Sequence, residues 1–355
     1  MQQLFKYFSF FLLLLGLGFS FEHKGEFTLQ LDQQDKEKLS AGARYVPEFF
    51  WSMPEYGLDT DLAFNAYMAD GIDSKTKVHR LWVRYGNEQM EIRIGLQKIN
   101  FGSAMLFRPL QWFDSIDPLD PLGFTEGVKG VLGRYYLPNN TNFWLWCLYD
   151  NRELKGREII PAKEETGEWG GRLQAPLFNG ETGLTYHQRR IDFGNSPTFS
   201  MLSCAVVPEE RIGLDGKWDI GIGVWVEAAQ IRTKTDIDDL YPEKQYHSTI
   251  GADYTFNIGN GLRVLAEKFN LDTDLEVKRR NINSQVYGIM ADYPLSLYDT
   301  ISVVQYYAEK NDSLSFNWQR TYDELIFRFM TTLAPDHTEK NKTTGALQIM
   351  ISYNY

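Results

Sequence analysis

Three stretches of this sequence alternate apolar and polar residues with a period of two. In residues 89–97 the even positions are apolar, and the odd positions are charged, polar or glycine. Residues 218–228 have apolar side chains at the even positions, and residues 345–355 have them at the odd positions from Leu347 onward. Successive side chains of a β-strand point to opposite faces. Each stretch is therefore a predicted strand with one apolar and one polar face.

Two kinds of break separate the predicted strands, and they alternate along the chain. Short breaks of turn-forming residues occur at 54–57, 86–87, 138–140, 179–180, 215–216, 259–261, 294–299 and 323–324. Longer charged or proline-containing breaks occur at 32–38, 70–76, 99–127, 151–166, 192–209, 231–245, 272–283, 310–313 and 334–344. The alternation predicts a structure with tight turns at one end and long loops at the other.

Eight short and nine long breaks divide the chain into eighteen strands, from residues 26–31 to the end at Tyr355. Sixteen strands is the alternative, if residues 26–31 and one other weak strand lie outside the wall. No linker or repeat divides residues 21–355, which we expect to form a single domain.

The N-terminus has the layout of a secretory signal peptide. Lys6 precedes an apolar run over residues 8–17, and Gly18-Phe19-Ser20 forms a small-x-small cleavage motif. Such a run is too short to cross a ~30 Å hydrocarbon layer. We expect cleavage after Ser20 and export of the mature chain.

Beyond Ser20 no stretch approaches the ~20 consecutive apolar residues that a membrane-spanning helix requires. Aromatic residues make up 15% of the chain, which favours a barrel with aromatic girdles at both membrane interfaces. In lipid only closure leaves no sheet edge with unpaired backbone groups. The predicted fold class is all-β, an antiparallel up-and-down transmembrane β-barrel. A soluble, secreted, β-rich binding protein is the alternative.

The break at residues 99–127 is unusually long for a connection inside a compact domain, and such connections are commonly functional. We expect it to fold into the bore of the barrel as a pore constriction, since patches of charge set selectivity in channels. Its candidate residues, with Lys129 at its exit, are Arg108, Trp112, Phe113, Asp114, Asp117, Asp120 and Glu126.

Two alternatives stay open for this loop. Asp117-Pro118 and Asp120-Pro121 are also ordinary turn formers with solvated carboxylates. The loop aromatics either line the channel as a stacking surface or pin the loop against the wall as a small core, and the second role is the commoner one.

Charged residues on the polar strand faces are expected to oppose the loop across the lumen. An arginine that faces lipid at the midplane costs ~2–4 kcal/mol, which favours an inward orientation. The candidate lumen-wall residues are Arg80, Arg84, Glu91, Arg93, Gln97, Arg134, Arg172, Arg189 and Arg328. The alternative is that these arginines mainly pair with lumen carboxylates such as Glu91 and stiffen the barrel.

The sequence does not indicate an enzyme. The five histidines have no recognisable spacing to a nucleophile, and no phosphate-binding loop or metal-spaced His or Cys pair is present. We expect no cofactor and no metal site, although oxygen ligation of Ca²⁺ by the loop carboxylates stays open. The formal net charge of −11 argues against nucleic-acid partners, and two cysteines cannot hold the fold by disulfides.

The string Arg93-x-Gly-x-Gln-x-Ile-x-Phe-Gly102, followed by Arg108-Pro109, Trp112-Phe113 and the Asp-Pro pairs, resembles a segment of porin-like outer-membrane β-barrel families of Gram-negative bacteria. Asp215-Gly216 with Trp218, Trp225 and Glu227 is similar to a later hairpin of such proteins. The resemblance implies an outer-membrane channel whose third long loop folds inward to narrow the pore.

The terminal strand resembles the signal recognised by the barrel-assembly machinery, although it ends in Tyr355 where phenylalanine is more usual. The expected partners are this machinery, outer-membrane lipid and small hydrophilic solutes, and association into homo-oligomers stays open. The expected function is passive diffusion of small hydrophilic solutes or ions. A plugged structural or adhesion barrel is the second hypothesis, and a soluble β-rich binding protein is the third.

Overall fold

The computed structural model describes residues 20–34, 39–114, 125, 127–196, 206–234, 241–274, 282–309, 312–335 and 343–355. Two short 3-10 helices, η1 (Pro54–Tyr56) and η2 (Phe193–Asn195), accompany the strands. The strands are β1 (Ser20–Gln34), β2 (Ser40–Met53), β3 (Leu58–Ala69), β4 (Ile72–Gly86), β5 (Met90–Gln97), β6 (Val128–Tyr136), β7 (Asn142–Tyr149), β8 (Gly167–Leu177), β9 (Gly180–Asp192), β10 (Val206–Asp219), β11 (Gly223–Thr233), β12 (Lys244–Phe256), β13 (Leu262–Thr273), β14 (Ile282–Pro294), β15 (Asp299–Ala308), β16 (Ser313–Tyr322), β17 (Leu325–Pro335) and β18 (Thr343–Asn354).

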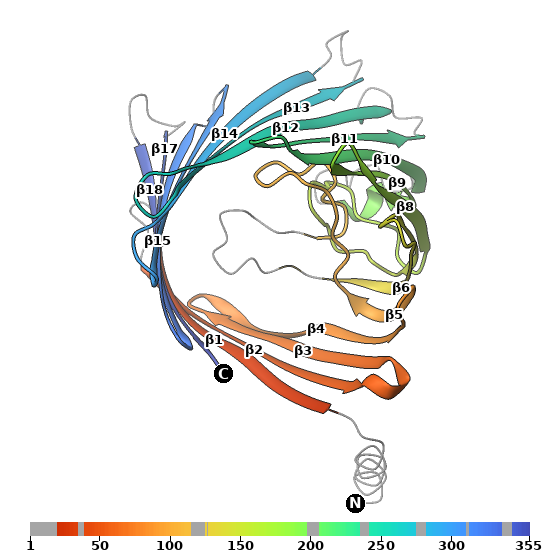
Figure 1. Ribbon diagram of the computed structural model, residues 1–355, viewed down its shortest axis with the longest axis horizontal. Helices are drawn as coiled ribbons and strands as arrows, with labels where there is room; N and C mark the ends of the chain where they lie inside the picture. Colours follow the sequence, from red (N-terminus) through yellow and green to blue (C-terminus); the bar gives the residue numbers. More distant parts are fainter. Residues whose placement is uncertain are drawn as a thin grey trace, which may run out of the picture.

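These eighteen strands form one closed antiparallel sheet (Figure 1). Each strand pairs with its neighbours in sequence, and β1 pairs with β18 from Glu26↔Asn354 to Gln34↔Ala346. Closure leaves no edge strand with unpaired backbone groups. The predicted all-β barrel of eighteen strands is confirmed, and its first strand is longer than the predicted 26–31.

The connections alternate in length, as predicted, but two predicted breaks are wrong. The predicted short break at Asp215-Gly216 lies inside β10, and the chain instead turns at residues 220–222, within the predicted strand 218–228. Gly221 supplies the positive φ of +92° for this turn, and its N–H donates to the Asp219 carboxylate at 3.1 Å.

Residues 70–76 are not a long loop, because β3 ends at Ala69, β4 begins at Ile72, and only Asp70 and Gly71 turn between them. Gly71 has a φ of +75°, and the Asp70 backbone N–H donates to the Ala41 carbonyl at 2.9 Å. The polar residues after Gly71 belong to β4, and the β3–β4 hairpin extends further toward the long-loop end than the shorter strand β5 does.

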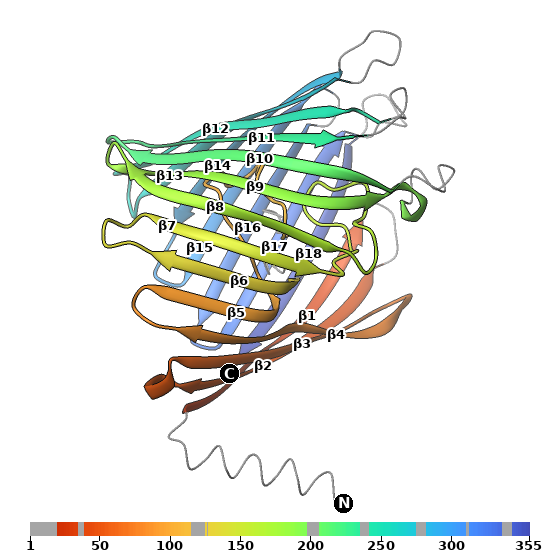
Figure 2. The ribbon, with the colours of Figure 1, turned by 90° about the vertical axis from the view of Figure 1, so that its right-hand side faces the viewer.

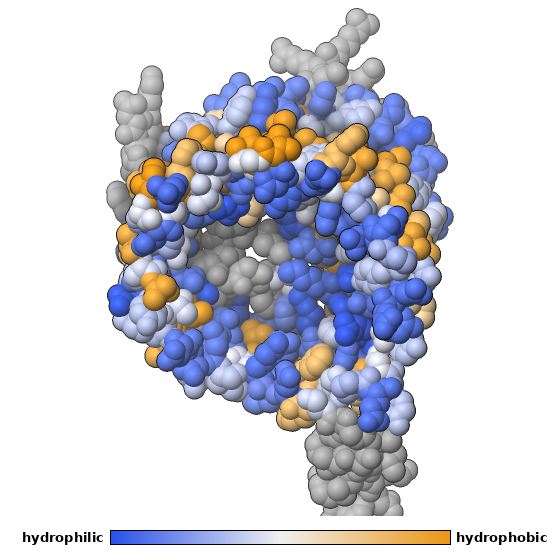
Figure 3. Space-filling view, in the orientation of Figure 1, coloured by the Kyte–Doolittle hydropathy of each residue, from blue (hydrophilic) through white to orange (hydrophobic). Residues whose placement is uncertain are grey.

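The apolar faces of the strands point outward and the polar faces point inward. Leu145, Val226 and Ile349 are exposed on the outer surface, whereas Glu227 is only 1% exposed and lies inside the ring. Figure 2 shows the tilted strands of the β5–β12 side of the wall, and Figure 3 shows an opening surrounded mainly by hydrophilic residues. No helix within the described part of the chain is long and apolar enough to cross a membrane.

Candidate functional site: the lumen and its inward segment

Residues 98–114, here called the inward segment, leave the wall at the end of β5 and lie inside the ring of strands (Figure 1). They reach the inner face of β10–β14, where Gly213 and Gly288 leave room for them. A Cβ atom built on Gly213 would lie 2.3 Å from a Leu110 methyl, and one on Gly288 would lie 2.7 Å from a Leu106 methyl. Glycine at these two wall positions therefore permits the close approach.

Glu267 on β13 holds the tip of the inward segment through its backbone. Its Oε1 accepts hydrogen bonds from the Met105 N–H at 2.6 Å and from the Trp225 indole N–H at 2.9 Å. Its Oε2 accepts from the N–H groups of Leu106 at 3.0 Å and Phe107 at 2.7 Å. Three consecutive backbone donors thus converge on one buried carboxylate.

Glu227, on the neighbouring part of the wall, makes a second clamp of the same kind. Its two carboxylate oxygens accept from the Ala104 N–H at 2.7 Å and from the Leu110 N–H at 3.2 Å. Between the two glutamates, the Thr249 hydroxyl on β12 donates to the Phe107 carbonyl at 2.7 Å. Hydrogen bonds to charged groups contribute ~1.5–3 kcal/mol each, so the two carboxylates are strong anchors for this segment.

Sequence analysis did not identify either glutamate as a site residue. Glu227 lies on the polar face of a clearly alternating strand, so its inward orientation was predictable, but its partners were not. Residues 262–271 fit both strand phases equally well in the sequence, and Glu267 could not be assigned to a face. The available signal was that Glu267 is a single carboxylate between Leu265 and Phe269, two apolar residues of the same strand face that are also buried.

An internal ion pair shapes the base of the inward segment. The Arg108 guanidinium donates to Asp114 at 2.9 and 3.2 Å, and also to the side chain of Asn100. Arg108 is 9% exposed and Asp114 is 1% exposed. Burial lowers the pKa of the nearby Lys98 ammonium, and the charge of Asp114 acts in the opposite direction. Arg108 and Asp114, both predicted as constriction residues, therefore neutralise each other within the inward segment.

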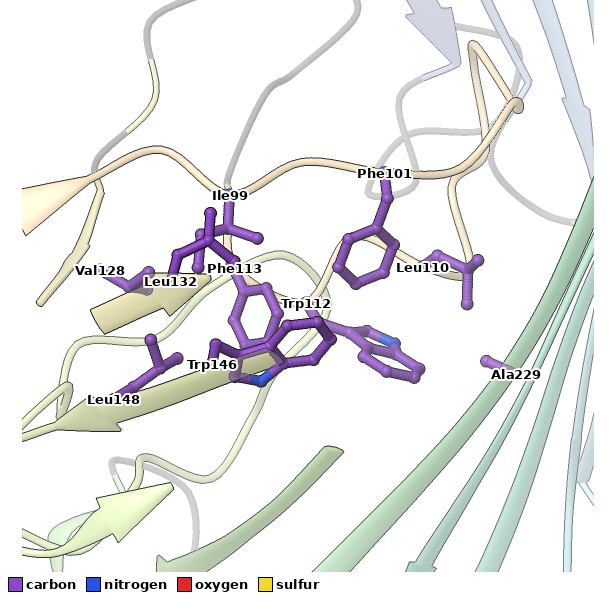
Figure 4. Close-up of a cluster of buried hydrophobic side chains, with 10 residues drawn as sticks. All are labelled: Ile99, Phe101, Leu110, Trp112, Phe113, Val128, Leu132, Trp146, Leu148 and Ala229. Carbon is purple, nitrogen blue, oxygen red and sulfur yellow. The ribbon is translucent and has the colours of Figure 1, made fainter. Parts of the chain in front are cut away.

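Aromatic side chains fix the segment to the wall at β6, β7 and β11 (Figure 4). Phe101 stacks on Trp146 with ring centroids 6.0 Å apart, and Phe113 meets the same indole edge-on at 5.4 Å. Trp112 and Phe113 are buried in this cluster, which also contains Ile99, Leu110, Val128, Leu132, Leu148 and Ala229. The packing supports the pinning interpretation of these aromatics over the stacking-surface one.

A second loop, residues 150–166, also packs inward. Glu158 accepts from Arg189 at 2.8 Å and from Arg211 at 2.9 Å, and both arginines also contact Glu209 at 2.7 Å. All four side chains are nearly inaccessible to solvent. The loop amine Lys155 donates to the backbone carbonyls of residues 151 and 153, and burial lowers its pKa. The predicted wall residue Arg189 therefore joins this loop to β9 and β10.

Buried pairs continue along the wall next to this network. Arg172 on β8 makes a bidentate contact with Asp215 on β10 at 2.6 and 2.9 Å. His187 accepts at Nδ1 from the Trp146 indole N–H at 3.2 Å, which leaves its Nε2 to face Glu168 at 3.1 Å. An acceptor at Nδ1 makes Nε2 the protonated nitrogen of the neutral ring. The histidine thus donates to the Glu168 carboxylate.

On β5, Glu91 contacts three predicted arginines. Arg93, Arg134 and Arg84 lie 3.1, 3.4 and 3.6 Å from its carboxylate oxygens. The remaining predicted wall residues also face inward: Arg80 donates to the Thr125 carbonyl at 3.1 Å, Gln97 donates to the Gly130 carbonyl at 3.2 Å, and Arg328 donates to the Ser352 hydroxyl at 3.1 Å. The contacts of Glu91 match the alternative in which wall arginines pair with lumen carboxylates, whereas the hydrogen bonds of Arg80 and Arg328 named here go to uncharged oxygen atoms.

One predicted constriction residue lies elsewhere, and three lie outside the described residues. Lys129 is an exposed residue of β6 in register with Leu96 on the outer face, where it contacts Asp150 at 3.4 Å. The strand resumes at Val128, as the sequence suggested, and Lys129 is its second residue. Val128 is buried on the inner side, so the period of two turns Lys129 away from the lumen. Asp117, Asp120 and Glu126 fall outside the described residues.

A cavity of about 250 Å³ separates the inward segment from the second loop. Its lining includes Gln111, Tyr241, His247 and Phe269, and the Arg157 guanidinium carbon lies 4.2 Å from the centre of the Phe269 ring. Burial raises the pKa of Tyr241 to about 12. The lining of this cavity thus combines aromatic rings with cationic groups and with the carboxylates of Glu158 and Glu209.

The sheet has an even number of antiparallel strands and is closed on itself, with an apolar outer face and charged residues inside. These features define the class of outer-membrane β-barrels. Solved structures of such proteins share this fold. OpdK of Pseudomonas aeruginosa, whose structure contains vanillate, aligns with a TM-score of 0.63 and 10% identity over 95% of this chain and 98% of that chain.

Two further structures support the same fold. OccD3 (OpdP) of Pseudomonas aeruginosa aligns with a TM-score of 0.59 and 11% identity over 95% of this chain and 91% of that chain. The anion-selective porin from Comamonas acidovorans aligns with a TM-score of 0.54 and 12% identity, over 95% of this chain and 100% of that chain. No protein-family model and no curated protein matches the sequence. The fold is therefore that of outer-membrane porins.

Proposed function

We propose that this protein is an outer-membrane channel for the passive diffusion of small hydrophilic solutes or ions, and not an enzyme. Residues 1–20 act as a cleaved signal peptide, and residues 21–355 form the single barrel domain in the outer membrane of a Gram-negative bacterium. The observation that carries the proposal is an outward apolar surface combined with a charged lumen that an anchored segment crosses.

Exposed charged groups inside the ring support a water-filled lumen. The side chains of Arg84 and Arg263 retain 38% and 32% of their accessible surface although both face inward and contact inward carboxylates. A plugged structural barrel would bury these groups. A soluble binding protein would turn its apolar faces into a core, and Leu145, which is 71% exposed on the outside, has the opposite orientation.

Liposome swelling tests the proposal. Liposomes that contain the refolded, full-length mature protein are expected to swell in isotonic solutions of small sugars, at rates that fall as the sugar becomes larger. A plugged barrel with a normal heat-dependent shift in gel mobility would give no swelling above that of protein-free liposomes, and such a result would contradict the channel function.

The charges of the constriction loop are proposed to bias ion selectivity. Replacing Asp114 and Asp117 by asparagine removes two negative charges, and loss of Asp114 also leaves Arg108 without its carboxylate partner. The reversal potential in a potassium chloride gradient is therefore expected to shift away from cation preference. Glu88→Gln, in a short turn remote from the loop, is the control. An unchanged reversal potential would remove this loop from the account of selectivity.

A further inference from the structure

The short turns of this barrel differ sharply in polarity between its two sides. Four consecutive turns, from β8–β9 to β14–β15, present large apolar residues to the outside. Phe178 is 83% exposed, Ile220 is 72% exposed and Leu297 is 97% exposed. Ile222, Ile258 and Leu295 are also exposed in these turns. Scattered apolar residues are normal on a protein surface, but an apolar residue at every turn of one side is a pattern that requires an explanation.

The turns on the rest of the barrel are mainly polar. Exposed residues between β4 and β5 are Asn87, Glu88 and Gln89, and the turn between β16 and β17 consists of Asp323 and Glu324. Asn139 and Asn140 are exposed between β6 and β7. The turn between β2 and β3 exposes Pro54, Glu55 and Tyr56. Turns that expose isoleucine, leucine or phenylalanine between the strands are therefore confined to one side of the short-turn end.

The outer face of the same side becomes polar unusually close to that end. Lys268 on β13 is in register with Ile250 and Tyr287, which are both exposed on the outside. Beyond these positions the outward residues form polar contacts with one another: Asn270 with Ser248 at 3.4 Å, Gln230 with Tyr246 at 3.3 Å, and Tyr287 with Gln285 at 3.1 Å.

Strands on the opposite side keep an apolar outer face much further toward the long loops. Leu31 and Met68 are exposed near the long-loop ends of β1 and β3. The outward positions of β2 from Met53 to Ala41 are all apolar or aromatic. The apolar belt has two boundaries, one nearer the long loops and one nearer the short turns. On β11–β15 both boundaries lie closer to the short turns than they do on β1–β3.

Strand geometry shows that the displacement is needed to span a membrane. Lys268 lies six residues after Leu262, the first residue of β13, which corresponds to about 15 Å along the barrel axis at ~3.3 Å per residue and a tilt of ~40°. The apolar band of such barrels is ~25 Å tall. The strand alone cannot supply this height below Lys268, and the apolar turns supply the rest.

We propose that the barrel sits obliquely in the outer membrane, so that the four apolar turns, from β8–β9 to β14–β15, insert among the acyl chains of the periplasm-facing leaflet. The turns β4–β5 and β16–β17 stay in water. This inference rests on the proposed function. Acyl chains are the occupant because the apolar turns are continuous with the lipid-facing belt. A protein partner at the turns would explain why the turns are apolar. It would not explain why the long-loop boundary of the apolar belt is shifted in the same direction.

Depth-dependent quenching tests this proposal in the full-length mature protein. Single cysteines are introduced by Ile220→Cys and Leu297→Cys at the apolar turns, in a background in which Cys147 and Cys204 are replaced by serine. Glu88→Cys and Asp323→Cys are the matched turn controls, and Leu145→Cys reports on the belt. Each variant is labelled with an environment-sensitive fluorophore and measured in phosphatidylcholine vesicles with chain-brominated lipid and, separately, with aqueous iodide.

Labels at residues 220, 297 and 145 are expected to be quenched several-fold more by brominated lipid than labels at 88 and 323, and less by iodide. If residue 145 is quenched by lipid while 220 and 297 behave like 323, the oblique insertion is wrong and the channel proposal stands. If 220 and 297 are shielded from both quenchers, protein covers the turns and the inference is also overturned. If residue 145 is not quenched by lipid, the membrane-spanning function itself fails.

Discussion

Replacement of both Glu227 and Glu267 by glutamine is expected to raise the single-channel conductance by about twofold or more, since each lost hydrogen bond to a charged group forfeits ~1.5–3 kcal/mol. The two carboxylates accept five backbone N–H groups of the inward segment. A glutamine amide turns its own N–H donors toward some of these groups and cannot accept from all of them. Residues 104–110 should then leave the β11–β13 wall and widen the passage or make it fluctuate.

Asp59→Asn provides the control for this double variant. Asp59 is an inward carboxylate that pairs with Arg84 at the other side of the lumen and makes no described contact with the inward segment. Its conductance should stay near that of the unaltered protein. Equal conductance of the double variant and the unaltered protein, with an unchanged circular dichroism spectrum, would show that the clamps do not define the passage.

Arg172→Leu is expected to lower the free energy of unfolding by ~3–5 kcal/mol, because it leaves the buried carboxylate of Asp215 without its cation. Arg172 and Asp215 are both almost fully buried and meet through two hydrogen bonds. Replacing both residues by leucine removes the uncompensated charge. Since buried ion pairs are often exchangeable for apolar residues at little cost, the double variant should recover most of the lost stability.

Urea unfolding of the refolded protein in detergent micelles, followed by tryptophan fluorescence, measures both effects. The exposed pair Arg232–Glu243, 3.4 Å apart with both side chains nearly half exposed, is the matched control. Arg232→Leu should change stability by less than ~1 kcal/mol, as for other exposed ion pairs. A double Arg172/Asp215 variant that is as unstable as Arg172→Leu would indicate that the pair itself, and not the orphaned charge, determines the cost.

The barrel was predictable because its determinants are local. Strand alternation and turn-forming residues report on the faces and on the chain reversals without any knowledge of long-range contacts. The Asp70–Gly71 turn was missed because the polar residues after it look like a loop, although they belong to a hairpin that extends past the membrane belt. Lys129 was grouped with the loop, but it is the second residue of β6, where its side chain faces the opposite way from the inward Val128.

The anchoring of the lumen was less predictable, because it joins residues far apart in the sequence: more than a hundred positions for Glu267 and the inward segment, and 31 and 53 positions for Glu158 and its two arginines. Glu267 holds residues 105–107, and Glu158 of the second loop holds Arg189 and Arg211. Nothing in the local sequence of either glutamate indicates these partners. The pairing of the wall charges with one another depends on strand register, which the sequence pattern does not specify.

Single-channel recording in planar bilayers tests the central claim most directly. The mature protein, purified from membranes and added at low concentration, is expected to produce discrete conductance steps well above the protein-free background. An absence of steps, for protein whose gel mobility changes on heating as a folded barrel's should, would mean that the enclosed space does not conduct and would contradict the account of this molecule as an open channel.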